Sequence, residues 1–358
     1  MKIIFTNSIF YLQKKGGISR YYVNLSRELN KLNIKHKILA PLSKNYYLKN
    51  LKENNFSLYI KKFPDNFIIK KINHILFKYF LRKENPDIIH ETYYNSDNLS
   101  ILKDKIKIIT VYDLIHEKFS NIYNKKKKLE KQKIIKSADH FICISKKTQY
   151  DFISYYKISP KKTSVIYLGC DHFKMNRIKK YNLNLPKNFF LYVGSREGYK
   201  NFELLVKATK ILNNFHNINV VCFGGGKFSK LEINKYKLKK NFINIQGGDE
   251  LLSFLYSKAF ALINTSRYEG FGITNIEAMQ LGCPVISSDF KTLKEIGASS
   301  CLFFKNNNHE DLAKKIKIFI LKEKIRKKFI KKGHQRSRNF TWINCAKKTK
   351  KLYENLAK

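Results

Sequence analysis

The chain of 358 residues is 43% hydrophobic and 14% aromatic, which supports packed cores, excludes a disordered protein and, at this length, favours two domains. Its formal net charge is +44, but only nine of the 71 basic residues are Arg, the residue on which nucleic-acid binding usually relies. We therefore ascribe the excess of Lys first to coding bias and second to attraction toward an anionic membrane or a phosphorylated substrate.

The first twelve residues combine one early Lys with a short, interrupted apolar run, which predicts a buried strand and not a signal peptide. No apolar run reaches the roughly eighteen residues that cross a membrane. We expect a cytoplasmic protein, with the cytoplasmic face of the inner membrane as a further expected location. The six cysteines form no C-x-x-C pair, so we expect buried, reduced thiols that bind no metal.

Strand-like apolar runs alternate with helical patterns through the first half of the chain, as is typical of a parallel sheet with crossover helices. The expected strands are 2–6, 35–40, 87–91, 107–112, 140–145 and 163–169, and the expected helices include 19–32 and 68–83.

The expected helix at 68–83 has a broad apolar face and basic residues elsewhere. The apolar face holds Ile68, Ile69, Ile72, Ile75, Leu76, Tyr79 and Phe80. A crossover helix that packs on the core is the favoured interpretation. The alternative is an amphipathic helix that lies on an anionic membrane.

A polar, Lys-rich stretch at 171–188 interrupts this alternation and is the expected linker. Further strands are expected at 189–195, 218–226, 242–248, 259–266, 283–289 and 301–304, followed by a basic helical tail from about Glu310. The fold class is thus α/β, with two doubly wound domains at 1–170 and 189–340. We expect a C-terminal helix at 341–358 to pack back toward the first domain.

Most of the fifteen glycines fall where an expected strand ends. They include 16–17, 169, 194, 198, 224–226, 247–248, 270 and 272. Glycine allows sharp turns and close approach of a ligand to the backbone, and ligands of open α/β sheets bind at the carboxyl ends of the strands. These clusters in both halves predict two ligand-binding edges that face each other across a cleft.

Residues 266–285 read SRYEGFGITNIEAMQLGCPV and hold two carboxylates, Glu269 and Glu277, around a glycine turn. Thr274 and Glu277 match a T-x-x-E capping box, so Glu277 has a structural explanation. The amides at this helix start, from Ile273 and Thr274, favour a ligand that carries phosphate. Glu269 has no structural explanation, and a carboxylate at a strand end can accept hydrogen bonds from hydroxyls.

This stretch closely resembles the E-x7-E signature of retaining glycosyltransferases with the GT-B fold, family 4 (the glycosyltransferase group 1 family). Further similar segments are YVGSREGYKNFELLVKA, VCFGGGKFSKLE, GGISRYYVNLSREL, DIIHETYY and ITVYDLIHEKF. The resemblance extends over nearly the whole chain and includes bacterial mannosyltransferases of surface-polysaccharide synthesis. It implies two Rossmann-like domains that face a cleft, with the acceptor side in the N-terminal one.

The resemblance also implies roles for single residues. Glu269 would bind hydroxyls of the donor sugar, Glu277 would bind the ribose, and Arg196 and Lys200 would clamp the diphosphate. Glu269, Arg196 and Lys200 are the expected catalytic residues. The expected donor-binding set is Glu277, Gly270, Phe271, Gly272, Ile273, Thr274, Gly16, Gly17 and Gly194.

Four residues are expected on the acceptor side by the same resemblance: Arg20, His90, Asp113 and His116. A lone His at a strand end is otherwise more often a structural residue. The chain departs from the family at Tyr112, where many members have His. The resemblance implies a front-face retaining mechanism in which the leaving phosphate deprotonates the acceptor, without a protein nucleophile. The sequence has no D-x-D, so we expect neither a metal nor another cofactor.

The leading hypothesis is the transfer of a hexose, with mannose favoured, from a nucleotide-diphosphate sugar to a glycan or polyprenyl-diphosphate-linked acceptor in lipopolysaccharide synthesis. Peripheral contact with an anionic membrane is expected, and nucleic acid is not an expected partner. A non-hydrolysing nucleotide-sugar epimerase is the alternative on a similar fold. A basic nucleic-acid-binding protein is a distant alternative, because it explains neither the strand-end glycines nor the paired glutamates.

Overall fold

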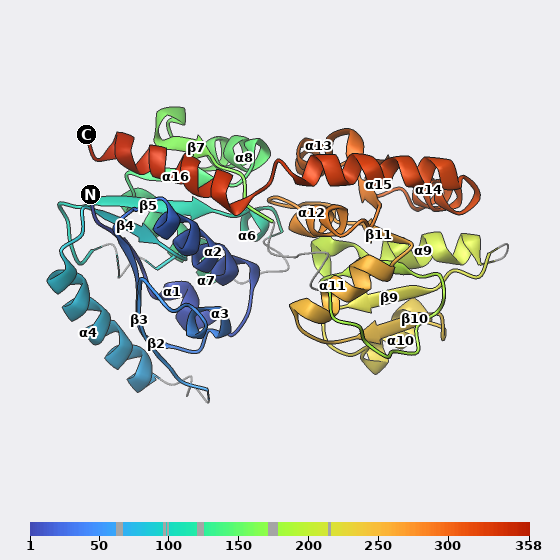
Figure 1. Ribbon diagram of the computed structural model, residues 1–358, viewed down its shortest axis with the longest axis horizontal. Helices are drawn as coiled ribbons and strands as arrows, with labels where there is room; N and C mark the ends of the chain where they lie inside the picture. Colours follow the sequence, from blue (N-terminus) through green and yellow to red (C-terminus); the bar gives the residue numbers. More distant parts are fainter. Residues whose placement is uncertain (62–66, 96–97, 99, 120–124, 171–177, 214–215) are drawn as a thin grey trace. The chain divides into compact units, whose positions relative to one another are not determined.

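The computed structural model describes residues 1–61, 67–95, 98, 100–119, 125–170, 178–213 and 216–358 (Figure 1). They form two compact units: unit 1 is Met1–Gly169 with Trp342–Lys358, and unit 2 is Cys170–Thr341. Each unit holds a parallel sheet with helices around it, which confirms the predicted α/β class. Residues 171–177 of the expected linker lie outside the described residues.

Unit 1 has, within its described residues, a seven-stranded parallel sheet in the order β3-β2-β1-β4-β5-β6-β7. Its strands are β1 (Ile3–Phe5), β2 (His36–Ser43), β3 (Asn55–Tyr59), β4 (Ile88–Glu91), β5 (Ile106–Val111), β6 (His140–Cys143) and β7 (Thr163–Val165). The strand order reverses direction between β1 and β4. In open α/β sheets such a switch point leaves a crevice at the carboxyl ends of the two strands.

The helices of unit 1 follow its strands in turn. They are α1 (Ser8–Leu12), α2 (Gly17–Lys31), α3 (Tyr46–Lys49), α4 (Phe67–Glu84), α6 (Ile115–Lys118), α7 (Lys125–Ser137), α8 (Lys146–Tyr156), the short 3-10 helix η1 (Pro160–Lys162) and α16 (Trp342–Leu356). The C-terminal helix α16 packs against α2, and the Tyr353 hydroxyl lies 2.6 Å from Nδ1 of the buried His90. The last helix of the chain thus belongs to the first unit.

Unit 2 has, among its described residues, a six-stranded parallel sheet in the order β10-β9-β8-β11-β12-β13. Its strands are β8 (Phe190–Val193), β9 (Val220–Phe223), β10 (Phe242–Ile245), β11 (Ala261–Asn264), β12 (Val285–Ser288) and β13 (Cys301–Phe304). The order reverses between β8 and β11, which places the switch point of this sheet there.

The helices of unit 2 are η3 (Gly198–Lys200), α9 (Phe202–Leu212), α10 (Lys230–Tyr236), α11 (Asp249–Lys258), α12 (Ile273–Gln280), α13 (Lys291–Gly297), η4 (Ala298–Ser300), α14 (His309–Leu321) and α15 (Glu323–Ser337). The basic helical tail expected from about Glu310 is divided into α14 and α15, because Lys322 has non-helical dihedrals. After residues 338–341 follows the helix expected separately at the C-terminus, α16. The core of the unit is apolar side chains from β8, β9, β11, α9 and α14.

All six cysteines are free and buried, as predicted. Burial raises the pKa of the thiols of Cys143 and Cys222 to about 12, so they remain protonated at neutral pH. Among the described residues, no helix combines the length and the apolar composition that crossing a membrane requires.

The helix α4 packs on the core, as the favoured interpretation expects, but not through the predicted apolar face. It packs on β2 through another side, where Asn73, Phe77 and Leu81 are buried and the Asn73 Oδ1 accepts from the Leu42 amide at 3.0 Å. Most of the predicted core-facing side chains, Ile68 and Ile75 among them, are exposed. Helical periodicity identified the apolar face correctly, but this face does not pack on the sheet.

Candidate active site

Lys200 and Glu269, two of the expected catalytic residues, meet at the switch point of unit 2. Glu269 follows β11, and its Oε1 accepts from the Lys200 Nζ at 2.6 Å and from the Ser266 hydroxyl at 2.7 Å. The two charged side chains are 17% and 12% exposed, so the pair is shielded but still reachable from solvent. A strong ion pair of this kind holds both groups in one geometry before a ligand arrives.

Backbone contacts between two segments position Lys200. The Thr265 hydroxyl donates to the Lys200 carbonyl at 2.8 Å, and the Arg267 amide donates to the Tyr199 carbonyl at 2.8 Å. These bonds join the turn after β8 to the turn after β11. The side chain of Lys200 then passes over Gly194, where an added Cβ would lie 3.6 Å from its Cε. Gly194 has φ +128°, a value that favours glycine.

The helix α12 begins directly after the glycine turn. Its N-cap is Gly272, which has no side chain to bond the first amides, and Thr274 lies inside the helix, so the expected capping box is absent. The amides of Ile273 and Thr274 stand at this end, where the helix dipole favours an anion. Glu277 is 2% exposed, and its Oε2 accepts from the Tyr256 hydroxyl at 3.1 Å. Its position as the fifth helical residue explains why it does not cap.

Arg196 does not lie beside Lys200 as an open cation. Its guanidinium is 1% exposed and turns into the loop after β9, where its nitrogens donate to the carbonyls of residues 224–227 at 3.0 to 3.2 Å. The guanidinium also forms an ion pair with Glu232 at 2.7 Å, which holds the pKa of that carboxyl below its usual value. Of the two cations expected to bind the diphosphate, Arg196 therefore has its guanidinium occupied by contacts within the chain.

The loop that Arg196 holds has an unusual backbone. Gly224, Gly225 and Gly226 have φ values of +88°, +69° and +77°, which side chains rarely adopt. An added Cβ at Gly225 would come within 2.9 Å of Arg196 Nη1. The planar guanidinium of Arg196 carries several donors that fit this row of carbonyls. These hydrogen bonds fix the conformation of the loop at the carboxyl end of β9.

Unit 1 has a hollow of about 410 Å³ at its own switch point. Residues after β1 line it with residues after β4, and α4 and α7 complete it; the lining is Asn7, Ser8, Tyr11, Leu12, Lys70, Asn73, His74, Tyr94, Asn95, Glu130 and Lys133. None of these was predicted from sequence. Their sequence signals differ: Asn7 and Ser8 follow the first expected strand, Tyr94 ends the family-like segment DIIHETYY, and Lys70, Asn73 and His74 lie on the expected helix at 68–83.

Comparison with known proteins bears directly on both units. The family model described as Glycosyltransferase Family 4 matches residues 15–173, and the model described as Glycosyl transferases group 1 matches residues 174–336. Together they cover residues 15–336 without a break, which include the sheet of unit 2 and the Lys200–Glu269 pair. The chain belongs to this glycosyltransferase family.

Relatives of known name agree with this assignment. An uncharacterised glycosyltransferase of Methanocaldococcus jannaschii is 29% identical over 100% of the chain and 99% of that protein. The O-antigen chain mannosyltransferase RfbU of Salmonella typhimurium is 30% identical over 51% of each protein, so the chain spans about half of that relative.

Solved structures share the fold of the glycosyltransferase. A glycosyltransferase from Rickettsia africae has a TM-score of 0.72 at 21% identity, with 100% of this chain and 98% of that one covered. The Anabaena protein HepE, solved in complex with UDP-glucose, has a TM-score of 0.76 at 15% identity over 99% of this chain and 100% of the other. At these identities the likeness concerns the GT-B fold alone.

Gly270 and Phe271 lie in unit 2, in the turn between β11 and α12, and the Phe271 ring is buried 5.6 Å from the ring of Phe340. The remaining expected residues of the glycosyltransferase lie in unit 1. Gly16 is the N-cap of α2 and Gly17 its first residue, with α1 between them and β1 where a direct strand-to-helix loop was expected. Arg20 is half-buried with its guanidinium 5.8 Å from the Tyr47 ring. Asp113 Oδ1 accepts from the Ile115 amide at 3.0 Å.

His116 lies on α6, within the segment that follows β5, and is half-buried. The buried Lys131 braces this segment: its ammonium donates to the Asp113 carbonyl at 2.7 Å and pairs with Glu117 at 2.9 Å. A buried pair of this kind costs stability if one partner is removed, so it holds the segment in one arrangement.

His90 does not fit the expected acceptor side, because its ring is fully buried. One ring nitrogen bonds the Tyr353 hydroxyl and the other lies 2.8 Å from the Thr110 hydroxyl. Burial lowers its pKa to about 3, so the ring is neutral in the folded glycosyltransferase. His90 therefore fits the alternative given for a lone His at a strand end, a structural residue, and its hydrogen bond to Tyr353 links β4 to α16.

The neighbouring Glu91 is also fully buried, and burial raises its pKa from 4.5 to about 7. Between these pH values the folded state keeps a proton that the unfolded chain has released, so this residue's contribution to stability is lost as pH rises. We expect the free energy of unfolding of the wild type, relative to Glu91→Gln, to fall as pH rises through this window. Urea unfolding across a pH series measures it, and parallel profiles would contradict it.

The contribution of His90 to stability changes with pH in the opposite direction. Below pH 6.5 the unfolded chain binds a proton there that the folded state refuses down to about pH 3, so its contribution to stability is lost as pH falls. The two residues therefore offset each other between about pH 4.5 and 6.5, the range in which both windows overlap. The Glu91→Gln variant isolates the carboxyl because His90 is present in both proteins.

Gly272 offers a test of the turn that carries the helix start. It has φ +82°, and an added Cβ would lie 2.4 Å from Leu293 Cδ2. We expect Gly272→Ala to lower the free energy of unfolding by about 2–3 kcal/mol, from backbone strain and overpacking together. Gly226→Ala is the matched control, since Gly226 has φ +77° and open space around it, and should lose only about 1 kcal/mol. If urea unfolding shows the same loss of free energy for both variants, contact with Leu293 does not contribute to the effect of Gly272→Ala.

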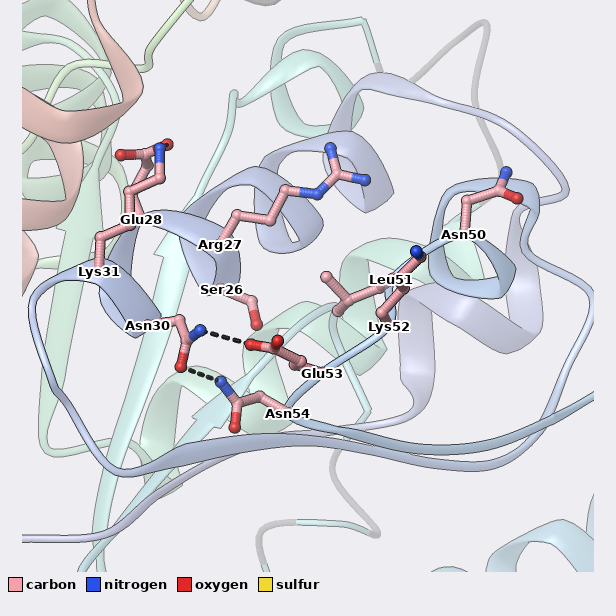
Figure 2. Close-up of a pocket in the computed structure, with 10 residues that line it drawn as sticks. All are labelled: Ser26, Arg27, Glu28, Asn30, Lys31, Asn50, Leu51, Lys52, Glu53 and Asn54. Atoms are coloured by element: carbon pink, nitrogen blue, oxygen red, sulfur yellow. Dashed lines mark hydrogen bonds and ion pairs between the residues drawn. The ribbon is translucent and has the colours of Figure 1, made fainter.

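A second hollow in unit 1, of about 390 Å³, lies between the end of α2 and the segment before β3 (Figure 2). Asn30 sits within it, where it donates to Glu53 at 2.6 Å and accepts from Asn54 at 2.7 Å (Figure 2). Because α2 ends before β2 begins, this hollow is at the amino ends of the strands. It is therefore at the edge of the sheet opposite to the switch-point crevice.

Proposed function

We propose that this glycosyltransferase moves a hexose, with mannose favoured, from a nucleotide-diphosphate sugar to an acceptor of surface-polysaccharide synthesis, with retention at the anomeric carbon. The observation that carries the proposal is the Lys200–Glu269 pair, 2.6 Å apart at the switch point and next to the start of α12. It offers a cation and backbone amides for phosphate, together with a carboxylate for sugar hydroxyls. The named mannosyltransferase relative supports the choice of sugar.

The donor chemistry follows from these groups. The diphosphate binds at the Lys200 ammonium and at the amides of Ile273 and Thr274, which stabilise the charge that grows as the anomeric carbon–oxygen bond breaks. Glu269 accepts from hydroxyls of the sugar and orients it, and Glu277 binds the ribose. The new bond to the acceptor oxygen forms on the same face of the ring. The acceptor proton goes to an oxygen of the leaving phosphate.

The acceptor binds in unit 1 in this proposal, at the switch-point hollow where Lys70 and Lys133 stand on α4 and α7. Two cations there suit an acceptor that carries phosphate, such as a polyprenyl-diphosphate-linked glycan. Such an acceptor would place the reaction at the cytoplasmic face of the inner membrane.

The reaction needs no metal or other cofactor in this proposal, because Lys200 and the helix start supply the positive charge. We expect EDTA to leave turnover unchanged, measured as nucleoside diphosphate released per enzyme. Restoration of lost turnover by added Mg²⁺ would overturn this part.

The proposal is tested with purified protein and a panel of GDP-, UDP- and ADP-sugars. We expect one nucleotide class to raise the melting temperature and to be consumed only when a glycan acceptor is present, with the linkage anomer equal to that of the donor by NMR. Conversion of the sugar nucleotide in the absence of acceptor would favour the epimerase instead. Failure of every sugar nucleotide to stabilise the protein would overturn the donor site.

A further inference from the structure

The helix α4 presents an apolar stripe to solvent. Ile68, Ile72, Ile75 and Tyr79 recur at intervals of four, three and four residues, which aligns them on one face. Their exposed fractions are 66%, 42%, 56% and 61%. The opposite side of the helix, at Phe77 and Leu81, is buried on the sheet. The helix is therefore already packed on the core, and the stripe is an additional surface.

The edge strand β3 extends this surface. Phe56 and Leu58 point to the same side of the strand and are 41% and 63% exposed. The Phe56 ring lies 4.3 Å from the ring of Phe80 on α4, so strand and helix are in contact. Figure 1 shows α4 beside β3 on the outer side of unit 1.

We call this surface the α4–β3 patch; its members are Phe56, Leu58, Phe67, Ile68, Ile72, Ile75 and Tyr79. A single exposed apolar side chain is ordinary in a folded protein. Four exposed apolar side chains on one face of a helix, next to two more on a strand that contacts the helix, mark an interaction site.

Basic residues surround the stripe. Lys71 and Lys78 stand one turn on either side of Ile75, and Arg82 and Lys83 stand one turn beyond Tyr79; all four are exposed. The acidic residue of this helix, Glu84, binds Lys2 at 2.6 Å and also pairs with Lys37. No carboxylate of the described residues forms an ion pair with these four cations. The helix thus combines an apolar face with positive charge along its border, which complements an anionic interface and not an apolar protein core.

We infer that the α4–β3 patch lies on the surface of an anionic lipid bilayer, with the stripe among the upper acyl chains and the bordering cations on lipid phosphates. Eighteen residues of helix give about 27 Å of contact parallel to the membrane. This inference goes beyond the transferase proposal and needs neither donor nor acceptor. It has a consequence for catalysis, because the other flank of α4 supplies Lys70, Asn73 and His74 to the unit 1 hollow. A lipid-anchored acceptor would then enter that hollow beside the membrane.

The test is flotation of the full-length protein with vesicles of phosphatidylcholine, with and without phosphatidylglycerol. We expect binding to the anionic vesicles and at least about tenfold weaker binding to neutral ones. The double variant Ile68→Glu with Ile75→Glu should lose anionic binding by about tenfold or more, because it places charge among the acyl chains. The matched control is Leu231→Glu on α10, where Leu231 is 82% exposed outside the patch, and it should bind as the wild type does.

A second experiment removes the positive charge of the bordering lysines and leaves the apolar stripe unchanged. Lys71→Gln with Lys78→Gln should weaken anionic binding several-fold and make it less sensitive to salt, while circular dichroism and urea unfolding stay unchanged. These residues are exposed, so the variants test binding and not folding. Failure of the wild type to bind anionic vesicles, or equal binding by the glutamate double variant, would overturn the inference. A dimer that the double variant dissociates, with no vesicle binding, would assign the patch to a second copy of the chain and would also overturn it.

Discussion

Replacing Lys200 by Ala or Glu269 by Gln is expected to lower turnover by at least about a hundredfold while the protein stays folded. Lys200→Ala removes the cation that would face the leaving diphosphate in the proposed mechanism. Glu269→Gln keeps the size of the side chain and its bond to the Ser266 hydroxyl, but it removes the negative charge that pairs with Lys200 and accepts from sugar hydroxyls. The measurement is nucleoside diphosphate release at saturating acceptor, with urea unfolding of each variant.

The two variants should also differ in their kinetics. Lys200 acts on charge that develops in the transition state, so its loss should appear mainly in kcat, whereas loss of the Glu269 contacts to the sugar should also raise KM for the donor. Lys207→Ala and Glu203→Gln are the matched controls. These residues form an ion pair of the same chemistry on α9, at 2.7 Å, but are 54% and 48% exposed. The controls should keep full turnover. If they lose as much turnover as the variants of Lys200 and Glu269, the assignment of these two residues to the active site is wrong.

Strand ends were the most predictable part of the protein. Both sheets follow from apolar runs that alternate with helical patterns. Parallel strands carry their loops to one edge, and Lys200 and Glu269 lie in two such loops, but the sequence did not show that they form an ion pair. The edge strand β3 was not predicted. Its alternating, half-exposed residues form no apolar run, and its pairing with β2 is a tertiary effect.

Side-chain direction was much less predictable than position. The spacing of Arg196 and Lys200 suggested two cations on one ligand, but only the fold reveals that the carbonyls of residues 224–227 lie within reach of Arg196. The same limit applies to α4. Its periodicity identifies an apolar face, but not which side of the helix the sheet covers.

Different tasks for Arg196 and Lys200 explain why one is buried and the other is not. A cation that binds a transient anion must remain reachable, and the Lys200 side chain is 17% exposed, whereas that of Arg196 is 1% exposed. We therefore propose that Arg196 acts as a positioning residue, because it holds the glycine loop after β9, at the strand end beside the proposed donor site. In this proposal its effect on the donor passes through that loop.

Arg196→Ala should consequently lower the free energy of unfolding of the protein by about 3–5 kcal/mol, the usual cost of removing one partner of a buried ion pair. The carbonyls of residues 224–227 would lose their donor, and Glu232 would lose its counter-ion. Arg196→Lys should recover only a part of the loss, because an ammonium cannot span the same row of carbonyls. Urea unfolding gives the stability, and calorimetric titration with the nucleoside diphosphate gives the affinity.

The control is Arg267→Ala, an exposed Arg that donates to Asn201 at 3.2 Å, which should change stability by no more than about 0.5 kcal/mol. A double-mutant cycle with Glu232→Ala separates the two interpretations of Arg196. If Arg196 positions the loop, the two residues couple strongly in stability, and either variant weakens nucleotide binding together with folding. If instead Arg196→Ala unfolds like the wild type and loses only affinity for the nucleotide, Arg196 leaves the loop to clamp the diphosphate and the positioning role is wrong.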